Sequence, residues 1–278
     1  MKLGWKIVGI AAAVLLVLGI ALIAVAYVTG GTPESLRNNV VLTDYAQSFP
    51  EETPTALDLE IDAGRLRLLS GGTLRVEAEN VPEDGFVCTL EDGVLTVREN
   101  LSASWSDELS QLMSMRKQDP EIRIYLPEDT KLTRTEMQIS AGDVQLGALD
   151  TAALTLDMRA GVLRAEGLRT DEAVLKLTAG TAAFTELDAQ ALHTEMAAGE
   201  LSVSGSVKNS CTVEIAAGSA ELKLLGTAAD YTAFLNAGVG AIDYNGHSYS
   251  MEKAFVGKGT GNMELENSVG SIRVEFFG

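Results

Sequence analysis

Aromatic residues are scarce in this sequence, at 5% of 278 residues, whereas hydrophobic residues together make up 46%. A core of this composition is built from Leu, Val, Ile, Ala and Met. Cysteine is scarcer still, and the only two, Cys88 and Cys211, cannot form a disulfide framework. Each lies at an apolar position of a strand-like run, so we expect two buried free thiols rather than a bridge between them.

Residues with catalytic or metal-binding chemistry are also few. The two histidines, His193 and His247, have no Cys, His or carboxylate at the spacing of a zinc site. Residues 257–261, Gly-Lys-Gly-Thr-Gly, lack the spacing and the flanking elements of a phosphate-binding loop. We therefore expect a protein that is not an enzyme and that has no cofactor. The alternative is a glycan-acting enzyme of the β-helix type that uses a pair of acids.

Positive charge is in deficit, because 21 Lys and Arg stand against 39 Asp and Glu, for a net charge of −18. Residues 1–30 hold two lysines and no acid, so the rest of the chain holds 39 acids against 19 bases, a net charge of −20. A body this acidic repels phosphate backbones, and we expect no nucleic acid partner.

One long hydrophobic run contrasts with this acidic body. Residues 7–28 carry no charge, and as a helix rising 1.5 Å per residue they cross the ~30 Å hydrocarbon core of a bilayer. Lys2 and Lys6 place residues 1–6 in the cytoplasm. We expect a single-pass cell-membrane protein whose body is extracytoplasmic. The alternative is a cleaved secretory signal ending near residues 24–26, Ala-Val-Ala, which exports the body as well.

The segment after the predicted membrane helix is broken by glycine and proline. Residues 29–54 include Gly30, Gly31, Pro33, Pro50 and Pro54. These residues interrupt any regular pattern, so we expect a linker or stalk. The exported body is then residues 55–278.

An Ala-Gly pair recurs in this body at a constant interval. Its glycine is residue 142, 161, 180, 199 and 218, each 19 residues after the one before, and a sixth pair, Ala237-Gly238, follows after 20. Apolar and polar residues alternate within each unit, as in a strand with one buried face, and the phase changes at the Ala-Gly corner. Because one unit cannot bury its apolar face alone, the sequence predicts an all-β fold, a repetitive β-solenoid or β-roll of stacked 19-residue units.

The same pattern extends to both ends of the body. Residues 57–68 and 263–274 are divergent copies of the unit. Further strands are expected at residues 73–78, 86–90, 94–98 and 121–126. Residues 101–119 interrupt the pattern with apolar residues at helical spacing before Pro120, which indicates a helical or loop insertion.

Residues 121–127, Glu-Ile-Arg-Ile-Tyr-Leu-Pro, precede the tandem Ala-Gly units, and one membrane segment lies before both. Together these features resemble the bacterial membrane-anchored "putative adhesin" β-strand-repeat family, a domain of unknown function, over roughly residues 55–277. The resemblance implies a strand-repeat fold at the cell envelope and brings no catalytic residues. Some relatives are associated with envelope-stress signalling.

One outward-facing position of the repeat carries charge. Four residues before the glycines stand Gln138, Asp157, Lys176, Glu195 and Glu214. Glu195 and Glu214 are expected in neighbouring layers about 5 Å apart, where they are a candidate cation site or else two solvated carboxylates.

We expect a membrane-anchored interaction or structural module, adhesin-like and without catalysis, whose partner is an envelope protein or polymer. A regulatory or sensory subunit of an envelope-stress response is the first alternative, and a glycan-acting enzyme is the second. The open ends of the solenoid also make self-association possible.

Overall fold

A computed structural model describes residues 41–100 and 119–278, and these residues are almost entirely β-strand, as predicted. The strands are β1 (Leu42–Phe49), β2 (Ala56–Ser70), β3 (Leu74–Pro82), β4 (Phe86–Glu91), β5 (Val94–Glu99), β6 (Glu121–Leu126), β7 (Lys131–Leu146), β8 (Leu149–Glu166), β9 (Leu168–Leu225), β10 (Tyr231–Tyr244), β11 (His247–Tyr249), β12 (Lys253–Gly257) and β13 (Gly261–Phe277). A short 3-10 turn, η1 (Ala228–Asp230), is the only helical element in the described part of the chain.

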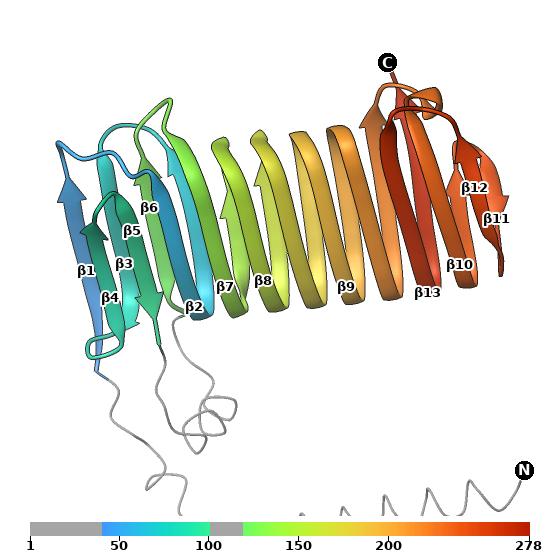
Figure 1. Cartoon of the computed structure of the whole chain (residues 1–278). Coiled ribbons are helices and arrows are strands. Elements are labelled where there is room, and N and C mark those ends of the chain that lie inside the picture. Colours follow the sequence, from blue (N-terminus) through green and yellow to red (C-terminus); the bar gives the residue numbers. More distant parts are fainter. Residues whose placement is uncertain (1–40, 101–118) are drawn as a thin grey trace, which may run out of the picture. The chain divides into compact units, whose positions relative to one another are not determined.

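The described residues wind in layers that stack side by side (Figure 1). From β7 to β9, each layer pairs in parallel with the next at the predicted offset of 19 residues, so that Met137 lies beside Leu156 and Leu156 beside Leu175. β9 is 58 residues long and continues through several layers without a break. The predicted repeat is therefore the unit of the fold.

Side chains alternate between the interior and the outer surface along every layer. In β8, Leu154, Leu156 and Met158 are buried while Thr155 and Asp157 are exposed. The core is mainly aliphatic, as the composition predicts. Both cysteines are free, as expected. Cys211 is fully buried, which raises the pKa of its thiol to about 12, whereas Cys88 in β4 is only partly buried.

A glycine forms the corner of each layer from β2 through β10, and these corner glycines stack on one another. They are Gly64, Gly142, Gly161, Gly180, Gly199, Gly218, Gly270 and Gly240, in spatial order. Gly199 has φ +140°, a region open almost only to glycine. A Cβ there would also lie 1.8 Å from the carbonyl oxygen of Gly180 in the preceding layer. Close stacking of the layers therefore requires glycine at the corner.

At the N-terminal end, the layers continue through strand pairs of mixed direction. β2 pairs in parallel with β7, β5 and β6, and its Gly64 lies beside Gly142. β4 and β5 form an antiparallel hairpin whose turn residues Asp92 and Gly93 both have positive φ, as a two-residue hairpin turn requires. The strands predicted between residues 73 and 126 are confirmed.

The predicted linker at residues 29–54 is wrong for the residues of β1. This strand pairs antiparallel with β3. Its Phe49 is buried, and the ring of Tyr45 lies 5.0 Å from that of Phe86, centroid to centroid. Pairing with β3 and these aromatic contacts hold the segment in the sheet, although prolines follow it closely in sequence.

The C-terminal layers do not stack in sequence order. β13 lies between β9 and β10, with Gly270 beside Gly218 on one side and Gly240 on the other. The predicted sixth corner, Gly238, is therefore wrong. Ala237 is buried at the position that Ile215 occupies two layers away. Ile215 lies three residues before its corner glycine, Gly218, so the corner that corresponds to Ala237 is Gly240.

Several predicted segments lie outside the described residues. These are the cytoplasmic residues 1–6, the membrane helix at 7–28, the linker up to residue 40, and the insertion at 101–119 except Asp119. Among the residues that the structure describes, no helix has both the length and the apolar character needed to cross a bilayer.

The stacking of corner glycines predicts a large loss of stability for Gly199→Ala. The new Cβ would meet a backbone oxygen that cannot move without separating two layers. We expect the free energy of unfolding of the full chain in detergent to fall by about 2 kcal/mol or more, measured by chemical denaturation with circular dichroism.

Gly71→Ala is the matched control, because Gly71 has the same φ of +140° but nothing within 4 Å of the added Cβ. It carries the backbone strain without the clash, and it should cost clearly less. Equal losses in the two variants would show that backbone strain alone, and not layer stacking, makes glycine necessary.

A buried hydroxyl predicts a stabilising substitution. Thr194 is fully buried, and its Oγ1 has no hydrogen-bond partner. Thr194→Val keeps the shape and removes the unsatisfied group, so we expect a gain of about 1 kcal/mol in the same denaturation experiment. Thr135→Val is the control, because the Thr135 hydroxyl donates a hydrogen bond to Thr151 Oγ1 at 3.1 Å. Removing it breaks this bond, so the free energy of unfolding should fall. A loss in both variants would contradict the prediction.

Candidate functional site

Outward side chains form straight columns across the strands, because the layers stack in register. The column four residues before the corner glycines is the most acidic feature of the repeat, and we name it the glutamate column. Its members are Glu60, Gln138, Asp157, Lys176, Glu195, Glu214, Glu266 and Asn236, in spatial order. We name the outer surface around its C-terminal half, from β9 to β12, the glutamate face.

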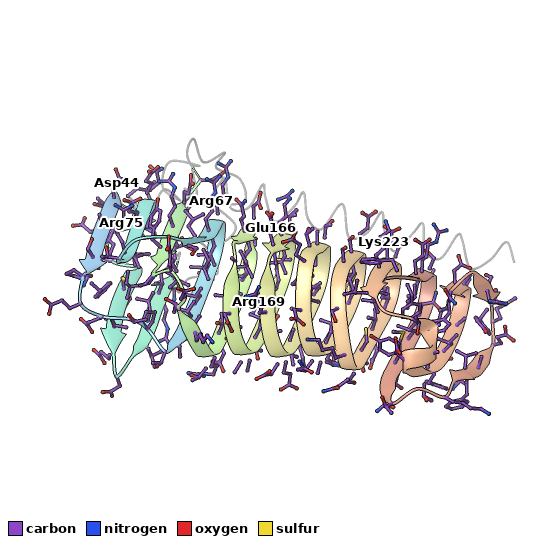
Figure 2. The ribbon with its side chains drawn as sticks, turned by 90° about the horizontal axis from the view of Figure 1, so that it is seen from above. Asp44, Arg67, Arg75, Glu166, Arg169 and Lys223 are labelled. Atoms are coloured by element: carbon purple, nitrogen blue, oxygen red, sulfur yellow. The ribbon has the colours of Figure 1, made fainter. Side chains whose placement is uncertain are left out.

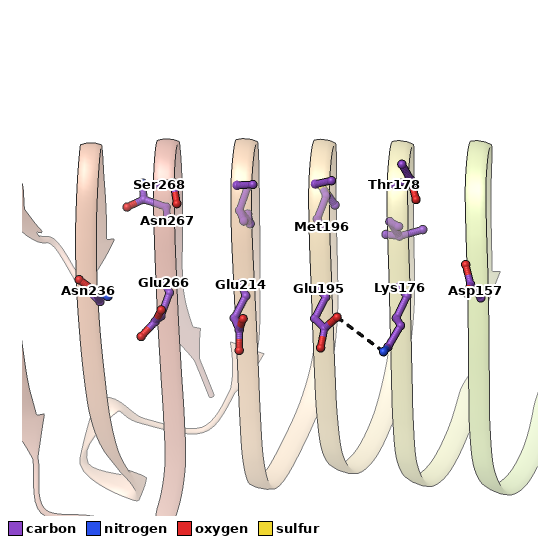
Figure 3. Close-up of a pocket in the computed structure, with 14 residues that line it drawn as sticks. Asp157, Lys176, Thr178, Glu195, Met196, Glu214, Asn236, Glu266, Asn267 and Ser268 are labelled. Atoms are coloured by element: carbon purple, nitrogen blue, oxygen red, sulfur yellow. Dashed lines mark ion pairs between the residues drawn. The ribbon is translucent and has the colours of Figure 1, made fainter.

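The structure brings the predicted pair Glu195 and Glu214 into neighbouring layers (Figure 3). It adds Glu266 of β13, which lies directly beside Glu214. Sequence reasoning missed this third carboxylate because 52 residues separate the two. The signal was present in the divergent copy at 263–274, where Glu266 stands four residues before Gly270. Three successive layers therefore carry a glutamate at the same position.

Glu195 differs from the other two because it has charged partners. His193 Nε2 lies 3.1 Å from its Oε1, and Lys176 Nζ lies 3.7 Å from its Oε2. The hydrogen bond from His193, followed by the charge of Lys176, lowers the pKa of the Glu195 carboxyl. His193, for which the sequence predicts no zinc site, thus contacts the carboxylate of Glu195.

Glu214, Glu264 and Glu266 have no ion-pair partner within residues 41–100 and 119–278. In these ranges no group of three or more His, Cys, Asp or Glu has the arrangement of a metal site. The cation site at Glu195 and Glu214 stays a prediction. The geometry supplies an open row of carboxylates rather than a closed set of ligands.

A groove of about 490 Å³ follows the glutamate column on its corner side. Its walls include the three glutamates, Lys176 and Asn236, and its floor includes small residues such as Ala197 and Ala216. The residues two before the corner are small in these layers, so the carboxylates stand above the surface beside them.

A second groove of about 580 Å³ lies within the glutamate face, on the other side of the glutamate column. Its lining includes Thr212, Glu264 and the aromatic pair Phe234 and Phe255. The ring centroids of this pair are 4.9 Å apart at an interplanar angle of 41°. Phe255 is 78% exposed on β12, which is the last strand on this side of the stack.

The N-terminal layers carry their charge in a different way. Arg123 bridges Glu79 at 2.8 Å and Glu121 at 2.9 Å, and Arg67 also reaches Glu121 at 3.3 Å. The two carboxylates raise the pKa of Arg123 above its ordinary value. Figure 2 shows labelled side chains of both charge signs, including Arg67 and Arg75, projecting from this end. Glu79 and Glu121 are thus neutralised within the protein, unlike Glu214, Glu264 and Glu266 of the glutamate face.

The remaining motifs of the sequence have structural places. His247 is exposed at the start of β11. Residues 257–261 connect β12 to β13, so they are followed by a strand and not by the helix that a phosphate-binding loop of the Walker type requires.

Solved structures that match this chain come from several bacteria. One is a "putative cell adhesion protein" of Clostridium sporogenes, 17% identical, with a TM-score of 0.42 over 85% of this chain and 100% of that one. "Putative adhesins" of Bacteroides fragilis and Parabacteroides distasonis are 13% and 11% identical, with TM-scores of 0.44 and 0.47 over 84% of this chain and 98% of theirs. At these sequence identities and TM-scores, the solved structures do not indicate a ligand for this chain.

No curated protein matches the chain. A family model described as "Toastrack DUF4097" matches residues 67–275, which is most of the chain and includes every layer from β7 onward. This match confirms the resemblance drawn from the repeat. The chain therefore belongs to the Toastrack DUF4097 family, a domain of unknown function.

Proposed function

We propose that this protein is a membrane-anchored, extracytoplasmic interaction module without catalytic activity, and that an outer strand face binds an envelope protein or polymer. The observation that carries the proposal is the column arrangement of outward side chains. A surface that repeats one side-chain position at every layer suits contact with an extended partner, as in other solenoid proteins.

The glutamate face is the part of this surface that best fits a partner. Its outward-facing aromatic pair and unpaired carboxylates lie outside the core, whose buried residues are almost all aliphatic. Exposed aromatic side chains in a groove are typical of interfaces. An adhesin-like role, the role named for the similar solved structures, is the form of contact that we propose.

Anchoring is part of the proposal and rests on the sequence. The uncharged run at residues 7–28 is long enough to cross a bilayer, and Lys2 and Lys6 favour a cytoplasmic N-terminus. In this arrangement the membrane segment only holds the module at the cell surface.

Site-specific photo-crosslinking in cells tests the proposal. A photoreactive amino acid is placed, one at a time, at Ala216 on the glutamate face, at Ser202 on the segment after a corner, and at Ala152 on the third side of the layers. All three side chains are exposed. We expect the full chain to form a discrete envelope adduct from Ala216 and little from the other two. Absence of an adduct at all three positions would overturn the proposal.

A helix replacement separates this proposal from the regulatory alternative, which the same membrane run supports. Residues 7–28 are exchanged for an unrelated apolar helix of equal length. A surface module needs only an anchor, so we expect the Ala216 adduct and surface level to remain unchanged. Loss of an envelope-stress response with the adduct intact would instead favour a regulatory subunit that acts through its membrane helix.

A further inference from the structure

The aromatic pair Phe234 and Phe255 lies on the outer side of the sheet at the C-terminal end of the glutamate face, with Phe234 half-buried and Phe255 exposed. Phe234 points outward from β10, between the buried residues Ala233 and Leu235, and it is directly opposite Phe255 of β12. Phe255 is 78% exposed although aromatic residues are only 5% of the chain. Two of the few rings therefore lie in contact on the outer side of the sheet, outside the hydrophobic core.

Unpaired carboxylates adjoin this pair in register. Glu264 of β13 lies directly beside Phe234, in the next layer. Glu266 projects from the same side of β13, two residues on, and is flanked by Glu214 and Asn236. The three glutamates have no ion-pair partner within the described ranges, as stated above. Like charges directly opposite on neighbouring strands destabilise a sheet, so this arrangement costs stability when the face is free.

Rings and carboxylates together select one kind of ligand. A Lys ammonium or Arg guanidinium is attracted to the face of an aromatic ring and pairs with a carboxylate. The long aliphatic stems of these side chains also cover exposed apolar surface. An anionic or neutral polymer would leave the glutamates unpaired.

We propose that the glutamate face binds an extended Lys- and Arg-rich segment of an envelope protein, with cationic groups over Phe234 and Phe255 and against Glu264 and Glu266. This inference rests on the proposed function and names the chemistry of the partner. The segment lies across the strands, along the groove that contains the aromatic pair and Glu264.

A second copy of the chain is a poorer occupant on grounds of charge. Residues 186–278, which include most of this face, hold 12 acids and 5 bases, a net charge of 5 − 12 = −7. Two such surfaces repel each other, whereas a basic segment gains from the same field.

Peptide binding to the full chain in nonionic detergent tests the inference. The probe is a short fluorescein-labelled peptide of alternating Arg and Ser, and fluorescence anisotropy gives its Kd. Phe255→Ala should weaken binding about two- to fivefold, the range of an exposed cation–π contact. The double variant Glu264→Gln with Glu266→Gln should weaken it by a similar factor or more, and the loss should shrink as salt is added.

Matched controls separate a specific face from general acidity. Glu166→Gln with Glu200→Gln removes the same charge from exposed positions after the corners, and Phe277→Ala removes another exposed ring. Both should leave Kd unchanged within twofold. Equal weakening of binding by the two double glutamate variants would show a diffuse attraction to the acidic body and would overturn the inference. The inference would also be overturned if the wild-type chain bound the Arg peptide no more tightly than a control peptide in which Gln replaces every Arg.

The two proposals fail separately. If the Ala216 adduct contains a glycan or an acidic protein while the Arg peptide does not bind, the interaction module stands and the basic partner is wrong. If the adduct forms only from Ser202 or Ala152, the module stands and this face is wrong.

Discussion

The close stacking of corner glycines is the constraint on which the rest of the structure depends. At Gly161, Gly180, Gly218 and Gly270 a Cβ would lie within 2.1 Å of the carbonyl oxygen of the glycine in the layer before. The backbone can turn and approach its neighbour at the same point only because this atom is missing. The turn fixes the register of each layer, register places the aliphatic residues inside, and it aligns the outer side chains in columns.

The stacked middle of the fold could be predicted because each layer pairs with the next in sequence. The interval of 19 residues and the alternation of apolar residues therefore determine β7, β8 and β9 almost completely. The ends follow a different rule. β13 enters between β9 and β10, and β1 pairs with β3, through contacts between distant segments that leave no periodic trace. In residues 238–240, Gly-Val-Gly, either glycine satisfies the local pattern, and only the buried side of β10 decides between them.

The candidate site was predictable to the same extent. Glu195 and Glu214 lie in adjacent repeats, so counting residues is sufficient to bring them together. Glu266 and Phe234 join them only when the order of β13 and β10 is known. Phe255 could not be assigned at all, because a rare phenylalanine in an alternating run is expected on the buried side, and here it is on the outer side of the edge strand β12. Residue chemistry was visible in the sequence, and its spatial grouping was not.

The two ends of the fold differ in how their outward carboxylates are paired. Near the N-terminal end Arg67, Arg123 and their acids form a neutralised network, whereas the carboxylates of β13 stand beside one another without a counter-charge. Both are compatible with the fold because stability comes from the corner glycines and the inward side chains. Outer columns are therefore free to vary without loss of the layers, and a fold of this kind does not determine a ligand. What distinguishes one such protein from another is the sequence of its outer columns. In this chain the glutamate column has an unbalanced negative charge, and a cationic partner would neutralise it.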